Sequence, residues 1–371
     1  MTVVRVPLPG ASSPDAAYDV IVGRGVWSRL PALLAERCPA HLYAVVTDSR
    51  VAQLYGDRLG RLLGEAGHTC RQFVFPAGEW NKVRETWADL GARRVAAGAG
   101  RDAAVIALGG GVAGDLGGFV AATLHRGIPY VQLPTTVLAM IDSSIGGKTG
   151  VDIPAGKNLV GAFHQPRFVL ADVDTLASLP RNQIAAGCAE AIKHGVVADA
   201  GYAGEVGTAA ARCLARSLDA LEPLVEGSIR IKGAIVAADA GERGRRQVLN
   251  FGHTVGHAVE SRSGYGLLHG EAVAIGMAVE AALAEQTGVA ARGTRDAILA
   301  LLASYDLPVT VPPTLSGDDL LETMRADKKV RAGVIRFALP AAIGRMAHAA
   351  DGAWTLAASP PQIRAALDAC R

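Results

Sequence analysis

Residues 103–124 read AAVIALGGGVAGDLGGFVAATL, and the fold class depends on how this apolar stretch is divided. It is about as long and as apolar as a helix that spans a bilayer. Asp115 lies near its middle, however, and the glycines at 109–111 separate a strand-like half from a helix-like half. A buried strand, a tight glycine turn and a helix therefore explain the stretch better than a membrane span does.

Other apolar runs of strand length surround this unit, and segments with helical spacing, such as 81–98, separate them. Continuous apolar strands that alternate with helices are typical of a parallel sheet covered on both faces. The sequence therefore predicts a Rossmann-like α/β domain with a mostly parallel sheet over residues 1–179. The expected strands are 42–46, 71–75, 103–108 and 129–133.

The pattern changes at about Pro180, where strand signals become rare and long alanine-rich segments with helical spacing take over. Such a pattern predicts an all-α C-terminal domain over residues 180–371. The expected helices are 183–197, 220–238, 248–262, 271–286 and 294–303.

Composition limits the class of protein. Of the 371 residues 50% are hydrophobic and 19% charged, and the formal net charge is +2. Such a chain can bury a large core, and its near-neutral charge argues against a nucleic-acid partner. The N-terminus has no basic segment before an apolar one, and the five cysteines form no CxxC pair. We therefore expect free thiols, no signal peptide, no membrane partner and a cytoplasmic location.

Glycine is abundant, with 44 residues in the chain. Three of these glycines, Gly109, Gly111 and Gly114, match G-x-G-x-x-G after an apolar strand. Glycines there let backbone N–H groups approach a pyrophosphate at a helix N-terminus. The alternative is a tight turn without a ligand. Asp48, after an earlier strand, is either a ribose ligand or the N-cap of a helix.

A second glycine-rich segment contains isolated charges. Residues 134–150 read PTTVLAMIDSSIGGKTG, and Gly156, Lys157 and Asn158 follow closely. Lysines flanked by glycines suit a phosphate or another anionic substrate. A P-loop would require glycine at the position of Asp142, so nucleoside triphosphate binding is disfavoured.

Three of the nine histidines, His253, His257 and His269, lie within seventeen residues. His253 and His257 are four residues apart and share a helix face. This spacing is typical of metal ligands or of a catalytic cluster. A zinc-protease motif would need glutamate where Thr254 stands.

Upstream of the histidines, Glu190 and Lys193 lie on one helix face, as an ordinary surface pair or as part of a site. Lys232, Arg246 and Asn250 precede the histidine cluster. An NAD-like site, a phosphate-binding lysine set and a metal site together indicate redox chemistry on a small phosphorylated polyol.

Across almost its whole length the chain resembles the 3-dehydroquinate synthase family of sugar phosphate cyclases. The resemblance rests on an ordered set of specific motifs. They are GGGVAGDLGGFVAAT, RGIP, LPTT, DSSIGGKTG, GKNLVGAF, GCAEAIKHG, NFGHTVGHA, LHGEAVAIGM and DKKVRAG.

The resemblance implies an NAD-binding domain joined to a helical metal-binding domain, and a site residue for each role. NAD contacts carry over to Asp48, Glu79, Lys82, Gly110, Gly111, Val112, Gly114, Asp115, Thr135, Thr136, Lys148, Lys157, Thr175, Leu176 and Ser178. The metal, Zn²⁺ or Co²⁺, carries over to Glu190, His253 and His269. Substrate contacts carry over to Asp142, Lys148, Asn158, Lys193, Lys232, Arg246, Asn250, His257 and one of Lys328 and Lys329.

The resemblance also implies the reaction and the assembly. The family converts the keto acid 3-deoxy-D-arabino-heptulosonate 7-phosphate to 3-dehydroquinate and phosphate. Transient oxidation by NAD, phosphate elimination, re-reduction and an intramolecular aldol closure follow one another. The family is usually a homodimer, and Arg126 resembles an arginine that reaches the partner's site.

Three alternatives remain open at this point. One is another sugar phosphate cyclase. Valiolone-type enzymes differ around Arg246 and Asn250, which disfavours them here, whereas an amino-dehydroquinate synthase does not. The second is a metal-dependent polyol dehydrogenase, which would release NADH, and the third is a non-catalytic NAD-binding protein. The chain departs from the family in DAGERGRR before Arg246 and at Cys188 and His194, and none of these removes an expected ligand.

Overall fold

The computed structural model describes residues 1–7, 17–154, 156–239, 241–242, 244–264, 266–326, 334–349 and 351–371. These residues form two compact units, Met1–Ser178 and Leu179–Arg371. The first is an α/β unit and the second is helical with short strands, so the predicted fold class is confirmed.

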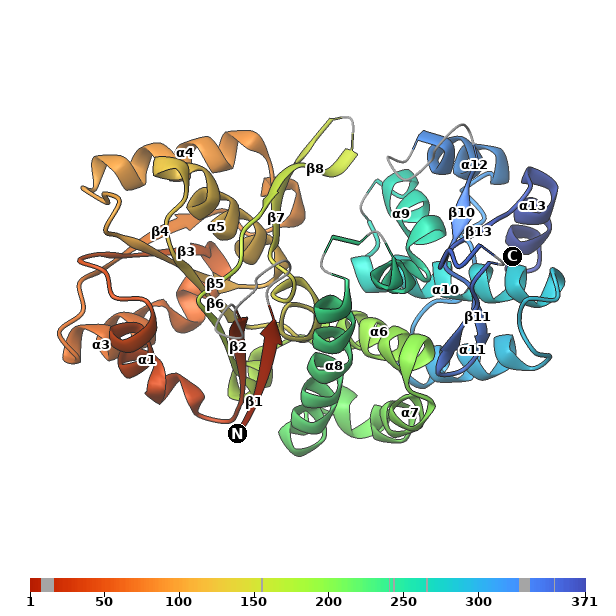
Figure 1. Ribbon diagram of the computed structural model, residues 1–371, viewed down its shortest axis with the longest axis horizontal. Coiled ribbons are helices and arrows are strands. Elements are labelled where there is room, and N and C mark those ends of the chain that lie inside the picture. The colour runs from red at the N-terminus through yellow and green to blue at the C-terminus, as the bar shows by residue number, and fades with distance from the viewer. Residues whose placement is uncertain are drawn as a thin grey trace. The chain divides into compact units, whose positions relative to one another are not determined.

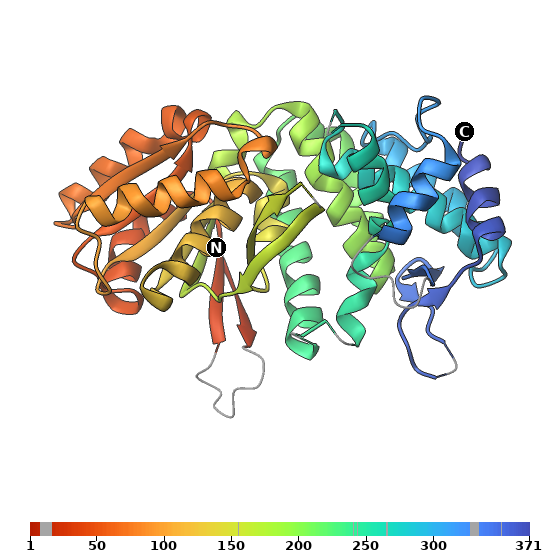
Figure 2. The ribbon, with the colours of Figure 1, turned by 90° about the horizontal axis from the view of Figure 1, so that it is seen from above.

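The first unit is built on a seven-stranded sheet with the order β1-β2-β9-β6-β5-β3-β4. β1 pairs antiparallel with β2, and every other neighbouring pair is parallel. Figure 2 shows β1 and β2 as a red hairpin at the end of the chain marked N. The strands are β1 (Thr2–Pro7), β2 (Ala17–Gly23), β3 (Tyr43–Asp48), β4 (Cys70–Phe75), β5 (Ala104–Gly109), β6 (Tyr130–Pro134) and β9 (Phe168–Asp172).

Helices cover both faces of this sheet (Figure 1). On one face α1 (Leu30–Arg37) and α3 (Asp57–Glu65) pack around the fully buried Trp27. On the other face α4 (Arg84–Ala96) and α5 (Gly111–Thr123) cover the apolar side chains of the central strands. Burial on both faces explains why β5 and β6 read as continuous apolar runs.

The connections of the sheet change direction between β3 and β5. From β3 the chain moves to β4 at one edge, and from β5 it moves through α5 to β6 on the other side. Ligands of open α/β sheets bind at the carboxyl ends of strands at such a switch point. Asp48 ends β3 and Gly109 ends β5, so both lie at this place.

A separate antiparallel hairpin, β7 (Lys148–Ile153) and β8 (Gly156–Phe163), follows β6. It carries the glycine-rich lysine segment. This hairpin and the strands β1, β2 and β9 are not among the strands expected from the sequence.

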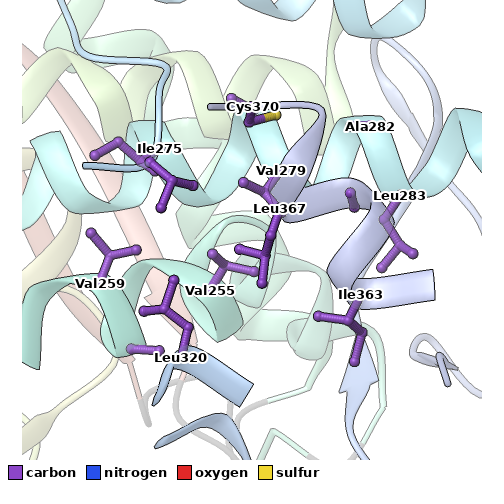
Figure 3. Close-up of a cluster of buried hydrophobic side chains, with 14 of the residues drawn as sticks. Val255, Val259, Ile275, Val279, Ala282, Leu283, Leu320, Ile363, Leu367 and Cys370 are labelled. Atoms are coloured by element: carbon purple, nitrogen blue, oxygen red, sulfur yellow. The ribbon is translucent and has the colours of Figure 1, made fainter. Parts of the chain in front are cut away.

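The second unit is a helical bundle whose core is made by α9, α10, α12 and α13. Figure 3 shows Val255 and Val259 of α9 facing Ile275 and Val279 of α10. The helices are α6 (Arg181–Ala198), α7 (Ala200–Leu214), α8 (Leu218–Ala238), α9 (His253–Arg262), α10 (His269–Gln286), α11 (Thr294–Ser304), α12 (Gly317–Ala326) and α13 (Pro360–Asp368). Short strands complete the unit: β10 (Arg336–Phe337), β11 (Pro340–Ala342), β12 (Arg345–Met346) and β13 (Leu356–Ala357).

The expected helix 248–262 is wrong in its first turns. Residues Arg245–Asn250 form a 3-10 turn, and α9 begins only at His253. Gly252 between them has a left-handed backbone, with φ 78°. A left-handed residue cannot continue a right-handed helix, so the 3-10 turn and α9 are separate elements.

Within the part of the chain that the structure describes, no helix combines the length and the apolar character needed to cross a bilayer. The apolar stretch around Asp115 is divided between β5 and α5.

Candidate functional site

Glu190, His253 and His269 bring three ligand atoms together in the second unit, all within 4.8 Å of one another. Glu190 lies in the middle of α6, whereas His253 and His269 open α9 and α10. The Nε2 atoms of His253 and His269 lie 3.4 and 3.6 Å from Oε1 of Glu190. The glutamate side chain is fully buried and the two histidine side chains are 12% and 28% exposed. The site is thus buried at its base and accessible at the histidines.

The other ring nitrogen of each histidine is already held. Nδ1 of His253 lies 3.1 Å from the carbonyl oxygen of Phe251, and Nδ1 of His269 lies 3.3 Å from Oε2 of Glu260. A histidine that donates from Nδ1 keeps the Nε2 lone pair for a metal. Two imidazole nitrogens and one carboxylate oxygen suit Zn²⁺ or a similar divalent ion and leave a coordination position open. The residues therefore fit the metal implied by the resemblance.

The surroundings of His269 make it strongly basic. Burial by itself lowers the pKa of the imidazole, but hydrogen bonding to Glu190 and Glu260 outweighs that effect and raises the pKa to about 10. The two carboxylates therefore favour the positively charged imidazole, with Glu260 at Nδ1 and Glu190 at Nε2. A divalent cation bound at Nε2 would replace the proton there and satisfy Glu190, while Nδ1–H stays bonded to Glu260.

Lys193 lies one helical turn from Glu190, and its Nζ contacts Oε2 of the glutamate. Both side chains are almost completely buried, at 2% and 0% exposed. The alternative of an ordinary surface pair is therefore wrong, because a buried ion pair has no solvent to screen it. Lys193 places an ammonium group directly beside the metal-ligand candidates.

His257 stands beside this group without belonging to it. Its ring centroid lies 5.2 Å from that of His253 and 5.9 Å from that of His269. The three atoms grouped as metal-ligand candidates come from Glu190, His253 and His269. His257 thus lies next to the candidate ligand atoms without contributing one of them.

Further basic and polar candidates lie on elements that pack against α6. Lys232 on α8 and Arg246 in the 3-10 turn are buried, with 6% and 2% exposure. The backbone N–H of Arg246 donates to Asp239 over 3.0 Å, and Nδ2 of Asn250 donates to Glu242 over 2.9 Å. The positive charges of Lys232 and Arg246 suit an anionic ligand.

In the first unit, the glycine turn leads directly into α5. The N-cap of α5 is Gly110, which has no side chain, so the first N–H groups of this helix are not capped by it. Those N–H groups and the helix dipole suit an anion. A Cβ at Gly110 would lie 3.3 Å from Thr136, and one at Gly114 would lie 2.8 Å from Gln132. Val112 lies in the first turn of the same helix.

Asp48 acts as the helix N-cap considered from the sequence, and its other carboxylate oxygen faces the glycine turn. Its Oδ1 accepts hydrogen bonds from the backbone N–H groups of Arg50 and Val51, as a helix cap does. Its Oδ2 faces Gly109, since a Cβ added there would lie 3.5 Å from this oxygen. The carboxylate therefore lies at the sheet's switch point with one oxygen turned to the glycine turn.

The structure gathers five of the expected NAD and substrate residues into one charged network. Lys82 is 5% exposed, and its Nζ lies 2.6 Å from both Oδ2 of Asp115 and Oδ1 of Asn158. Lys157 lies 2.9 Å from Glu79. Burial raises the pKa of Asp115 although Lys82 counteracts it, and the facing carboxylates raise the pKa of Lys82 against the effect of its own burial. The network joins α5 to the β7–β8 hairpin.

Asp152 belongs to this network and was missed from the sequence. Its Oδ1 accepts the backbone N–H of Asn158 over 2.8 Å, and its own N–H donates to the carbonyl of Lys82. Asn158 has a left-handed backbone with φ 54°. Asp152 of β7 therefore holds the start of β8, which carries Lys157 and Asn158. No sequence pattern marked Asp152 as a site residue, because a single acidic residue in a hairpin is common.

The remaining candidates lie in three places. Thr135 donates its N–H to the carbonyl of Gly109, and Thr136 caps the following turn through its hydroxyl, which accepts the N–H of Ala139. Asp142 and Lys148 flank the glycines of the next loop. Thr175, Leu176 and Ser178 share a 3-10 turn, and the Tyr55 hydroxyl bonds to Thr175 and Ser178 over 2.8 and 2.7 Å.

Some expected residues are not with the others. Arg126 follows the C-terminal end of α5, on the far side of that helix from Gly110, and has a left-handed backbone with φ 66°. Lys328 and Lys329 lie outside the described residues.

Two buried glutamates behind the histidines were also missed. Glu260 lies seven residues after His253 on α9, a spacing that returns to the same helix face. That spacing was a usable signal. Glu280 lies far along α10, and its role depends on contacts that no local pattern shows.

Comparisons with known proteins identify the family of the chain. The family model described as 3-dehydroquinate synthase N-terminal matches residues 72–186, and the one described as 3-dehydroquinate synthase C-terminal matches residues 187–330. The 3-dehydroquinate synthase of Symbiobacterium thermophilum is 48% identical over 359 residues, which cover 96% of this chain and 99% of that protein. That of Caulobacter vibrioides is 44% identical over 89% of this chain and 91% of its own length.

Solved structures point the same way. 2-Deoxy-scyllo-inosose synthase, in complex with carbaglucose-6-phosphate, NAD⁺ and Co²⁺, matches with a TM-score of 0.89 and 25% identity over the full length of both chains. 2-Epi-5-epi-valiolone synthase from Streptomyces hygroscopicus, with NAD⁺ and Zn²⁺, matches with a TM-score of 0.84 and 30% identity over 98% of this chain and 99% of that one. With the family models covering more than half of its length, the chain belongs to the 3-dehydroquinate synthase family.

Proposed function

We propose that this protein is a 3-dehydroquinate synthase, which converts 3-deoxy-D-arabino-heptulosonate 7-phosphate to 3-dehydroquinate and phosphate. The observation that carries the proposal is the buried group of Glu190, His253 and His269, with Lys193 against the glutamate. It occurs in a chain 48% identical to a 3-dehydroquinate synthase over nearly its whole length.

The second unit would hold the metal, Zn²⁺ or Co²⁺, through Glu190, His253 and His269. When bound, the metal polarises a substrate oxygen and NAD⁺ accepts and later returns a hydride, so that no net oxidation occurs. Lys193 contacts Glu190 and is placed to hold a substrate hydroxyl or carboxylate beside the metal-binding atoms.

The same unit supplies groups for the rest of the substrate. The buried cations Lys232 and Arg246 suit its carboxylate, since a guanidinium binds a carboxylate through two parallel hydrogen bonds. Asn250, held by Glu242, offers its amide to a substrate hydroxyl. The imidazole of His257 suits proton transfer to or from a molecule held at the metal ligands.

The first unit would bind NAD at its switch point. The uncapped N–H groups around Gly110 and Gly111 suit the pyrophosphate, and Oδ2 of Asp48 suits a ribose hydroxyl. Thr135, Thr136 and the turn with Thr175, Leu176 and Ser178 border that region, while Lys82, Glu79 and Asp115 hold the hairpin in place. Lys148, Asn158 and Asp142 on the adjoining loop and hairpin are proposed to meet the substrate phosphate and its neighbouring hydroxyl.

Assembly and location are part of the proposal. A homodimer in which Arg126 reaches the partner's site is supported by the place of Arg126, at the end of α5 away from the other candidates. A cytoplasmic location is supported by the five cysteines, all of them within the described residues and all free thiols.

The test measures the phosphate released from 3-deoxy-D-arabino-heptulosonate 7-phosphate when NAD⁺ is supplied at a much lower concentration than the substrate. We expect many phosphates per NAD⁺, no accumulation of NADH and loss of the rate in EDTA. No phosphate release with metal and NAD⁺ supplied would contradict the proposal. NADH formation in step with product would instead identify a polyol dehydrogenase, and a panel of amino and non-carboxylated analogues would separate the cyclases.

A further inference from the structure

Helix α9 opens with a metal-ligand candidate but cannot cap itself. Its N-cap residue is Gly252, which has no side chain, and its first residue is His253. The first turn of any helix presents N–H groups that need acceptors. An uncapped first turn frays, and fraying here would move the imidazole of His253.

A residue on another helix supplies the cap. Glu280 of α10 is fully buried. Its Oε2 accepts the N–H of Gly252 over 2.7 Å, and its Oε1 accepts the N–H of Val255 over 3.1 Å. The two oxygens of one carboxylate therefore bracket the first turn of α9, with His253 between the two donors.

We propose that Glu280 is a positioning residue of the metal site, which fixes His253 by capping α9 from a distance. The inference rests on the metal site of the proposed function. It concerns a residue that touches neither the proposed metal nor the substrate.

The packing of the two helices makes this contact rigid. Gly276 lies one turn before Glu280 on the same face of α10. A Cβ at Gly276 would overlap the carbonyl oxygen of Gly252, and one at Gly252 would lie 2.5 Å from Met277. The backbone of α10 therefore touches the turn before His253, and Glu280 has little freedom to release it.

The arrangement is reciprocal. Glu260 of α9 is 3% exposed and holds Nδ1 of His269, the first residue of α10. Glu280 of α10 holds the first turn of α9. Each of the two helices thus begins with a metal-ligand candidate and carries the buried carboxylate that steadies the other helix's beginning. Glu260 acts on the ring, whereas Glu280 acts on the backbone.

The test is the affinity of the purified full chain for Zn²⁺, measured by competition with a chromophoric chelator, for wild type and Glu280→Gln. Glutamine has the shape of glutamate but one acceptor oxygen, so it loses the charge and one of the two backbone bonds. Residues that orient metal ligands typically contribute about ten- to hundred-fold in metal affinity. We expect Glu280→Gln to weaken Zn²⁺ binding by about ten-fold or more. The circular dichroism spectrum of the metal-free variant should remain that of a helical protein.

Glu285→Gln is a matched control on the same helix. Oε1 of Glu285 accepts the N–H of Arg295 over 2.8 Å, in the first turn of α11, whose N-cap is also a glycine, Gly293. Helix α11 carries no metal-ligand candidate. Glu285→Gln should lower the melting temperature of the metal-free protein and leave Zn²⁺ affinity unchanged.

The outcomes separate the claims. Zn²⁺ affinity equal to wild type in Glu280→Gln, or an equal loss in Glu285→Gln, would overturn the inference, because Glu280 would then act only on general stability. Wild-type protein that binds no divalent ion would overturn the proposed metal site and this inference with it. Should Glu280→Gln not fold, Glu280→Asp is measured instead, and since its shorter side chain loses at least one bond, the same loss of affinity is expected.

Discussion

The Nδ1 atom of His269 lies 3.3 Å from Oε2 of Glu260, a nearly buried carboxylate on the neighbouring helix. This bond fixes the tautomer and the ring plane of the imidazole, so that Nε2 points to Oε1 of Glu190, 3.6 Å away. A carboxylate behind a histidine raises the basicity of the nitrogen that faces a metal. The same bond therefore steadies His269 as a candidate metal ligand.

His269→Ala is expected to lose the bound metal, whereas His257→Ala is expected to keep it and lose catalytic rate. The reason is that His269, and not His257, contributes an atom to the group of candidate ligand atoms. Elemental analysis of the purified variants, together with phosphate release, checks the difference. Metal retained by His269→Ala and lost by His257→Ala would show that the ligand assignment is wrong.

Lys82→Met is expected to destabilise the protein by about 3–5 kcal/mol, because removing one partner of a buried pair leaves an uncompensated charge. Lys82 is the cation that lies 2.6 Å from the buried carboxylate of Asp115. The free energy of unfolding in urea measures the loss.

Lys157→Met is the control for this prediction. Lys157 pairs with Glu79, whose side chain is 39% exposed, and such pairs contribute about 0–1 kcal/mol. Equal losses in the two variants would mean that burial does not decide the strength of these pairs.

Sequence patterns predicted the elements whose environment is uniform. β3, β5 and β6 are buried on both faces, and their apolar runs were recognisable to within two residues. The long helices α6, α8 and α10 were equally clear. By contrast, β8 is a mostly exposed strand whose residues show no apolar alternation. Its pairing with β7 depends on backbone hydrogen bonds, so no sequence pattern predicted it.

The candidate site divides in the same way. Residues that belong to a dense local motif, such as His253 and His269, were identifiable, and the structure brings them to Glu190 from 63 or more positions away. Glu280 acts through two backbone N–H groups of another helix. A contact with backbone leaves no complementary residue type at the other end, so no pattern in the chain announces it.

The buried thiol of Cys38 makes stability depend on alkaline pH. Burial raises its pKa to about 11 from an ordinary value of 9.0, although Arg167 opposes the shift. The folded state therefore holds a proton that the unfolded chain loses first. The stability that the protonated Cys38 thiol contributes is fully present below pH 9. As the pH rises to about 11, this contribution is lost and the free energy of unfolding falls by about 2–3 kcal/mol in all.

Cys38→Ala should flatten the fall in unfolding free energy between pH 9 and 11 relative to wild type. The measurement is a series of urea titrations across that range, and the comparison concerns the slope with pH, because the lost side chain also lowers the whole curve. Parallel curves for the two proteins would contradict the assigned cause.

Gly270→Ala is expected to remove metal binding by displacing α10. Gly270 follows His269, and a Cβ there would overlap the backbone carbonyl of Ala186, four residues before Glu190 on α6. Since that carbonyl is backbone inside a helix, the two helices must separate, which moves His269 from Glu190. Zn²⁺ titration and thermal unfolding measure the effect.

Gly204→Ala is the control, because a Cβ at Gly204 in α7 would meet no atom within 4 Å. That variant should gain about 0.5–1 kcal/mol of stability and bind Zn²⁺ as wild type does, so normal metal affinity in Gly270→Ala would show that the close approach of α6 and α10 is not needed to bring the ligands together.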